Sequence, residues 1–172
     1  MVILGIDPAI RTTGYGVIRA ESAAHFEILD CGIIANSARL PHTECLRRLA
    51  GGIRELVGAF TPDYASIEDP FVGRNASTAI ILGMARGAIL TALAESSVPV
   101  YSYSPSSAKR AAFGSGKATK EQVALMVSAE TGIAIERIPL DSTDAIALAV
   151  CHAQKLLHSG LGVPGAGIGK AL

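Results

Sequence analysis

The sequence lacks three features that would each indicate a particular class of protein: a regular cysteine pattern, an excess of one charge, and a long uninterrupted apolar run. Its three cysteines, Cys31, Cys45 and Cys151, are an odd number at spacings that match no zinc or redox motif, so we expect buried free thiols. The formal net charge is +0, which argues against a protein that coats nucleic acid through a general positive field.

No segment has the pattern of a membrane span or a secretory signal. The most apolar stretch, residues 76–94, carries Arg86 near its middle, and the cost of a central arginine in lipid favours a helix of a globular core. The apolar run at the N-terminus is only about six residues long and follows no basic region. We therefore expect a cytoplasmic protein without membrane association.

The apolar content is sufficient for one folded domain. Of the 172 residues, 49% are hydrophobic and 17% are charged, which is typical of a globular chain. Residues 2–6, 15–19 and 26–35 read as strands, and their short connections predict an antiparallel meander. An amphipathic helix follows and ends near Thr61-Pro62.

The second half alternates strands and helices. We expect strands at 64–67 and 98–103 separated by a long helix over 75–94, which implies crossover connections and a parallel part of the sheet. The prediction is an α/β fold with a mixed five-stranded sheet, three antiparallel strands followed by parallel ones, flanked by helices.

The last third reads as helices followed by a tail. A short helix over 106–112 and a glycine-bearing loop over 113–118 precede a helix whose start has the capping-box spacing of Thr119 and Gln122. A final helix runs from about Asp141 to about residue 157. We expect residues 1–158 to form the domain and the glycine-rich residues 159–172 to be disordered.

Four carboxylates stand where ordinary surface acids are not expected. Asp7 ends the first apolar strand, Glu68 ends the fourth strand, and Asp141 and Asp144 begin the last helix on one face. Either helical acid could simply cap the helix. A buried carboxylate such as Asp7, however, is costly unless it meets a cation.

The four acids together predict a divalent-metal site. Hard oxygen ligands without nearby histidine or cysteine favour Mg²⁺, for which Mn²⁺ can substitute, over zinc. Two such ions about 4 Å apart would support phosphodiester hydrolysis. The histidines show no spacing that demands a site, and we treat them as ordinary.

Other features leave two interpretations open. Lys109, Lys117 and Lys120 flank the glycine loop, which either binds phosphates or is merely a solvated basic loop. Phe71 is either a core residue or an exposed aromatic that stacks on a base. A stripe of small residues, Gly83 with Gly87, indicates either tight packing on the sheet or a homodimer interface.

These residues resemble the RuvC-type Holliday-junction resolvases, nucleases of the ribonuclease H-like superfamily. The resemblance runs from about residue 2 to 154 and rests on five ordered motifs: Ile3 to Gly16, Pro62 to Glu68, Gly83 to Gly87, Lys109 to Val123, and Asp141 to Ala145.

The resemblance implies a role for each predicted site residue. Asp7, Glu68, Asp141 and Asp144 match the catalytic acids, which bind two Mg²⁺ ions with Asp7 bridging them. Lys109 and Lys120 match basic residues needed for activity, and Phe71 matches an aromatic that stacks near the crossover. We expect Arg74, Asn75 and Lys117 to contact DNA as well.

The resemblance also implies partners and a reaction. A homodimer would nick two strands of like polarity symmetrically in a four-way DNA junction, together with a branch-migration motor of the RuvA and RuvB type. This chain departs from the usual pattern at Ala9 and at Asp69-Pro70, where the extra carboxylate could alter metal affinity. A non-cleaving junction-binding scaffold of the same fold and an actin-like phosphotransferase are the rival interpretations.

Overall fold

A mixed six-stranded sheet with helices on both faces organises the chain. The computed structural model describes residues 1–22, 25–70, 75–114, 119–158 and 170–172. The elements in chain order are β1 (Val2–Asp7), β2 (Thr12–Ala20), β3 (Phe26–Ala35), α1 (His42–Phe60), β4 (Tyr64–Glu68), α2 (Ala76–Glu95), β5 (Val100–Tyr103), α3 (Pro105–Phe113), α4 (Lys120–Thr131), the 3-10 turn η1 (Ile135–Arg137), α5 (Leu140–His158) and β6 (Lys170–Ala171). The sheet order is β3-β2-β1-β4-β5-β6.

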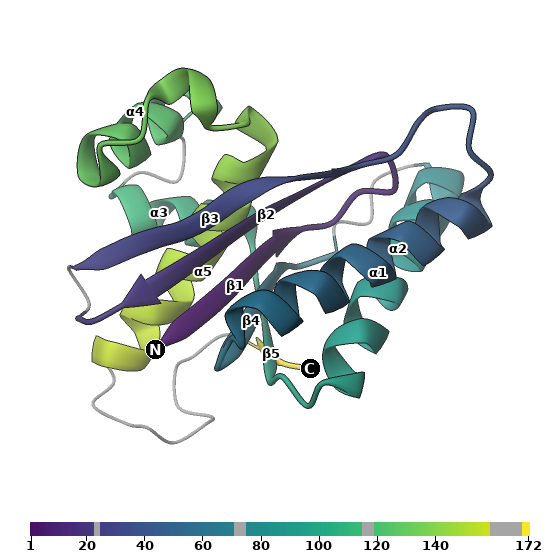
Figure 1. Ribbon diagram of the computed structural model, residues 1–172, viewed down its shortest axis with the longest axis horizontal. Coiled ribbons are helices and arrows are strands. Elements are labelled where there is room, and N and C mark those ends of the chain that lie inside the picture. The colour runs from purple at the N-terminus through teal and green to yellow at the C-terminus, as the bar shows by residue number, and fades with distance from the viewer. Residues whose placement is uncertain (23–24, 71–74, 115–118, 159–169) are drawn as a thin grey trace.

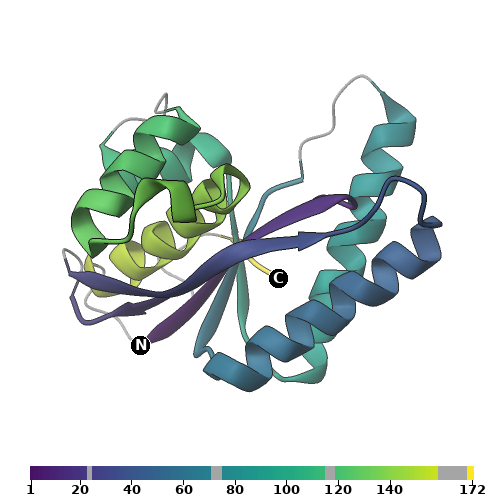
Figure 2. The ribbon, with the colours of Figure 1, turned by 45° about the horizontal axis from the view of Figure 1, so that its top comes forward.

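The helices form two layers that enclose the sheet. Figure 1 shows α1 and α2 on one side of the strands, with α3, α4 and α5 on the other, and the tilted view in Figure 2 separates the two layers. The antiparallel meander β1–β2–β3 and the parallel pairs β1–β4 and β4–β5 are as the sequence predicts. Strand β5 begins at Val100, later than expected, because Pro99 has no N–H to contribute to the ladder.

The sheet has one strand more than the sequence predicts. Lys170 and Ala171 pair antiparallel with Ser102 and Tyr101 of β5, and the Leu172 N–H donates to the Val100 carbonyl at 3.1 Å. The unpaired backbone groups of an edge strand explain why even a two-residue segment adds there. The expectation of a disordered tail is therefore wrong for residues 170–172, while residues 159–169 lie outside the described part of the chain.

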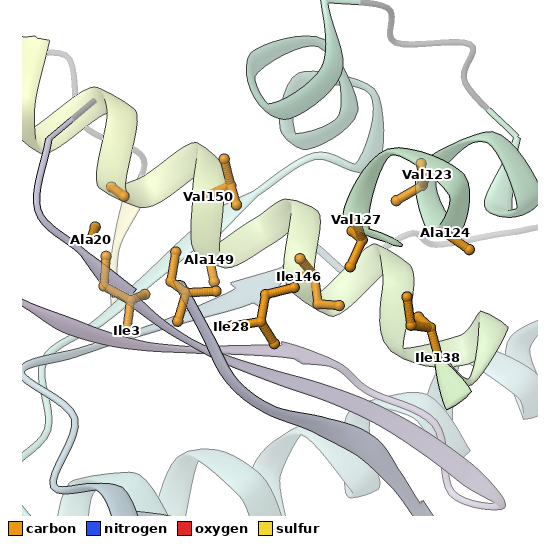
Figure 3. Packing of buried hydrophobic residues seen from close by; sticks show 12 residues of the cluster. Ile3, Ala20, Ile28, Val123, Ala124, Val127, Ile138, Ile146, Ala149 and Val150 are labelled. Carbon is orange, nitrogen blue, oxygen red and sulfur yellow. The ribbon is translucent and has the colours of Figure 1, made fainter. Parts of the chain in front are cut away.

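Helix α5 packs directly on the sheet backbone. A side chain at Gly5 would overlap the Ala145 carbonyl oxygen, and one at Gly14 would overlap the Asp141 carbonyl oxygen. Around this contact lies a cluster of buried aliphatic residues from the sheet, α4, α5 and the segment between those helices (Figure 3), which includes Ile3, Ile28, Val127, Ile138, Ile146 and Ala149. The first turns of α5 are thereby fixed close to the carboxyl end of β1.

Helix α2 is only partly buried. It has the length and composition of a membrane span, and 28% of its most apolar 18-residue stretch is buried inside the fold. Its packed side includes Ile89 and Leu93, which join the core between the sheet and α1. Gly83 and Gly87 are exposed, and a Cβ added at either residue would have no atom within 4 Å. The interpretation of a stripe packed tightly on the sheet is therefore wrong.

Candidate active site

Two carboxylates meet where β1 and β4 end side by side. The parallel register pairs Ile6 with Ile67, so the next residues, Asp7 and Glu68, project from neighbouring strands on the same face. Their carboxyl groups hydrogen-bond to each other. Burial, followed by the hydrogen bond to Asp7 and its charge, raises the pKa of Glu68 to about 8. Burial likewise raises the pKa of Asp7, and the charges of Asp144 and Asp141 add to that rise.

Helix α5 adds the other two acids. It begins at Leu140, so the interpretation of either acid as the N-cap is wrong, but Asp141 does lie in the first turn, where a negative charge interacts favourably with the helix dipole. The charge of Asp144 contributes to the raised pKa of both strand carboxyls, and the charge of Asp141 contributes to that of Asp7. The structure therefore brings together the four acids that the sequence singled out.

Two lysines from the other helices pair with the α5 acids. The Lys120 Nζ lies 2.8 Å from Asp141 Oδ1 and 3.6 Å from Asp144 Oδ2, and the Lys109 Nζ lies 3.0 Å from Asp144 Oδ1. Burial alone would lower the pKa of Lys120, but the hydrogen bond to Asp141 and the charges of Asp144 and Asp7 outweigh it and raise that pKa. The basic residues thus partly neutralise the acidic site.

A helix cap positions Lys120. Thr119 and Gln122 form the predicted capping box, in which the Gln122 N–H donates to Thr119 Oγ1 at 3.3 Å and the Thr119 N–H donates to Gln122 Oε1 at 2.9 Å. Lys120 is the first residue of α4, so the cap fixes the point from which its side chain reaches Asp141.

The donor set fits a hard divalent cation. Carboxylate oxygens are the ligands that Mg²⁺ prefers, and the four carboxylates outnumber the two ammonium groups that face them. Asp144 Oδ1 is buried and makes no hydrogen bond, although Lys109 lies beside it as an ion pair. Within the described ranges, no three His, Cys, Asp or Glu side chains lie close enough to hold one ion, and the lysines occupy the two acids of α5.

Sequence reasoning missed a buried arginine behind this site. Arg86 of α2 is 8% exposed and donates a hydrogen bond from its Nη1 to the main-chain carbonyl of Glu68. Burial lowers its pKa, and the charges of Asp69 and Glu68 oppose that shift. The signal was present in the sequence as one charged residue in the middle of an apolar helix.

The predicted DNA-contacting residues are only partly within the described structure. Phe71, Arg74 and Lys117 lie outside the described residues. Asn75 is the N-cap of α2, and its side-chain Oδ1 accepts a hydrogen bond from the Thr78 N–H at 3.3 Å. The structure thus gives Asn75 a structural role, and its predicted DNA contact stays a prediction.

The chain is similar to known proteins over most of its length. The family model described as "Crossover junction endodeoxyribonuclease RuvC" matches residues 3–152. A protein of that name from Chloroflexus aurantiacus is 40% identical over 153 residues, which cover 89% of this chain and 93% of the relative. One from Chlorobaculum parvum is 41% identical over 151 residues, covering 88% and 80%.

Solved structures show the same likeness. Thermus thermophilus RuvC in complex with a Holliday-junction substrate superimposes with a TM-score of 0.84 and 34% sequence identity, covering 100% of this chain and 99% of that one. The yeast mitochondrial Holliday-junction resolvase Ydc2 has a TM-score of 0.63 at 14% identity over 92% of this chain and 84% of its own, which is a likeness of fold alone.

Proposed function

Because this chain belongs to the RuvC family of crossover junction endodeoxyribonucleases, we propose that it is a Holliday-junction resolvase, an endonuclease of DNA recombination and repair. The observation that carries the proposal is the convergence of Asp7, Glu68, Asp141 and Asp144 from β1, β4 and α5. A junction-binding scaffold without activity is not favoured, because all four acids are present and meet in one site.

We further propose that the four acids hold two Mg²⁺ ions, for which Mn²⁺ can substitute. When bound, such ions polarise the scissile phosphate, activate a water as nucleophile and stabilise the leaving oxygen. Asp7, whose carboxyl group interacts with both Glu68 and Asp144, would be among the residues that hold these ions. Lys109 and Lys120, once freed from the α5 acids, can bind the phosphates of the DNA.

We propose that the DNA lies along the basic residues and the segment after β4. Lys109, Lys117 and Lys120 would contact phosphates, while Phe71 with Arg74 and Asn75 would contact bases near the crossover. The support is the ion pairing of Lys109 and Lys120 within the acidic site together with the family resemblance. Paired symmetric nicks would follow from two such sites in one dimer.

The exposed face of α2 supports a homodimer. Ile80 is 64% exposed and Met84 is 39% exposed, and the adjacent Gly83 and Gly87 leave room for another backbone to approach. We expect light scattering to show a dimer that Met84→Lys converts to monomer. The matched control is Leu125→Lys, which changes an apolar residue on α4 that is 62% exposed. A monomeric wild type, or a Met84→Lys protein that stays dimeric, would contradict this assignment.

The proposed partners follow from the reaction. A resolvase acts on four-way junctions, and we propose that a branch-migration motor of the RuvA and RuvB type delivers them. Because the proposed substrate is junction DNA, we propose that the enzyme acts in the cytoplasm, without membrane association.

The first experiment compares a synthetic four-way junction with a linear duplex of the same sequence, each with Mg²⁺ or with a chelator. We expect symmetric nicks only in the junction and only with the metal. Asp7→Asn should abolish cleavage but leave junction binding nearly unchanged, because it removes a metal ligand rather than a DNA contact. A variant that still cleaves would refute the metal site, and binding by the wild type without nicks would favour the scaffold.

A further inference from the structure

Two adjacent carboxylates, Glu68 and Asp69, face opposite sides of the sheet. Side chains alternate along β4, and Ile67 packs with Ile89 and Leu93 of α2 on the far side from α5. The Asp69 N–H donates to the Tyr103 carbonyl at 2.8 Å, so the ladder continues beyond the end of β4. Asp69 therefore projects with Ile67 toward α2, whereas Glu68 projects toward α5 and its acids.

Asp69 has partners of its own on that side. Its Oδ1 accepts a hydrogen bond of 2.6 Å from the hydroxyl of Ser102, which is 3% exposed. Ser102 pairs with Ile67 in the register of β4 and β5, so its side chain shares the face of Asp69. Asp69 is thus held by a neighbouring strand at the level of the catalytic carboxylates.

Arg86 connects this group to Glu68. A buried guanidinium is stable only where acceptors and negative charge surround it. Arg86 donates to the main-chain carbonyl of Glu68, and the charges of Asp69 and Glu68 both act on it. The main chain of Glu68 is held from the α2 side, while its carboxyl group meets Asp7 on the α5 side.

We propose that Asp69, Ser102 and Arg86 form a brace that positions Glu68 for metal binding, and that Asp69 is not itself a metal ligand. The proposal rests on the proposed function and explains the extra carboxylate beside the site. Residues that orient a metal ligand typically change metal affinity or activity by about 10-fold to 100-fold when they are removed. Each member of the brace is a positioning residue with an effect of that kind.

Metal binding and thermal unfolding together test the brace. Titrations that follow Tb³⁺ luminescence, with Mg²⁺ added as a competitor, would give the metal affinity of the full-length protein without DNA. Thermal unfolding would show that each variant is folded. The variants are Asp69→Ala, Ser102→Ala and the double variant. The matched control is Asp30→Ala on β3, which β2 and β1 separate from β4. It removes a half-buried carboxylate that accepts a hydrogen bond of 3.1 Å from the Tyr15 hydroxyl.

We expect each single variant to weaken metal binding about 10-fold and the double variant to weaken it no further, because both changes break the same brace. Ser102→Thr, which keeps the hydroxyl, and Asp30→Ala should both bind the metal with wild-type affinity. Loss of affinity in Asp69→Ala but not in Ser102→Ala would make Asp69 a ligand and overturn the proposal. Lower melting temperatures with wild-type metal affinity would overturn it too.

The two proposals can fail separately. If the wild type binds the metal with the expected variant pattern but nicks no junction, the brace stands and the resolvase assignment fails. If the wild type cleaves junctions while the brace variants bind metal and cleave like it, the resolvase assignment stands and the brace fails.

Discussion

One buried histidine should contribute a loss of stability to this protein as the pH falls. His152 of α5 is 0% exposed, stacks on Tyr101 with ring centroids 4.6 Å apart, and lies with its Nδ1 2.6 Å from the Tyr103 hydroxyl. Its Nε2 is buried without a hydrogen-bond partner among the described residues. Burial, with a smaller contribution from the charge of Lys155, lowers the pKa of His152 to about 4.

The sign and the size of the effect follow from this pKa. In the unfolded chain a histidine titrates near its ordinary value of about 6.5. Below that pH the unfolded chain takes up a proton that folded His152 does not, so the free energy of unfolding falls as the pH drops from about 6.5 to about 4. Between pH 7 and pH 5 the loss amounts to about 2 kcal/mol, and below pH 4 it approaches about 3 kcal/mol.

Urea unfolding of the wild type and of His152→Gln at pH 7 and at pH 5 measures the contribution of His152 to the free energy of unfolding. Other groups titrate too: the raised pKa values of Asp7 and Glu68 stabilise the fold as the pH falls. Those contributions are common to both proteins and cancel in the comparison. We expect the wild type to lose about 2 kcal/mol more than the variant between pH 7 and pH 5. Equal losses in the two proteins would refute the reasoning.

Two further predictions concern Lys120 in the acidic site and the backbone contact between Gly14 and α5. Lys120→Ala should slow cleavage and reduce the slope of log affinity against log salt by about one, because one phosphate contact is lost, and unchanged kinetics and slope would contradict this. Gly14→Ala should lower the free energy of unfolding by about 1–3 kcal/mol, since the added methyl overlaps the Asp141 carbonyl. Urea unfolding measures this loss, and a wild-type midpoint would show that α5 can move away freely.

The acids could be predicted from sequence because local rules determine their placement. Asp7 and Glu68 each end an apolar strand, and the carboxyl ends of neighbouring parallel strands meet at one edge of the sheet. Asp141 and Asp144 share the face of a helix whose apolar residues place it on the sheet. Strand alternation and helix periodicity were enough to bring these residues together.

The other features depend on contacts between segments far apart in sequence. In the sequence, Arg86 indicates only that its helix is no membrane span, because nothing local shows that it reaches the Glu68 carbonyl. No pattern in the sequence distinguishes His152 from the other histidines, because its burial arises where Tyr101 and Tyr103 of β5 meet α5. The pairing of Lys170 with β5 follows from a free sheet edge rather than from any pattern in the tail.

The glycines beneath α5 make the catalytic geometry insensitive to the composition of the core. A helix that rests on side chains shifts when those side chains change size, whereas α5 rests on main-chain atoms at Gly5 and Gly14. Its height above the sheet is set by the contact radii of backbone atoms, which are the same in every sequence. A change in the size of an aliphatic residue around the contact should therefore leave the separation of Asp7 from Asp144 nearly unchanged.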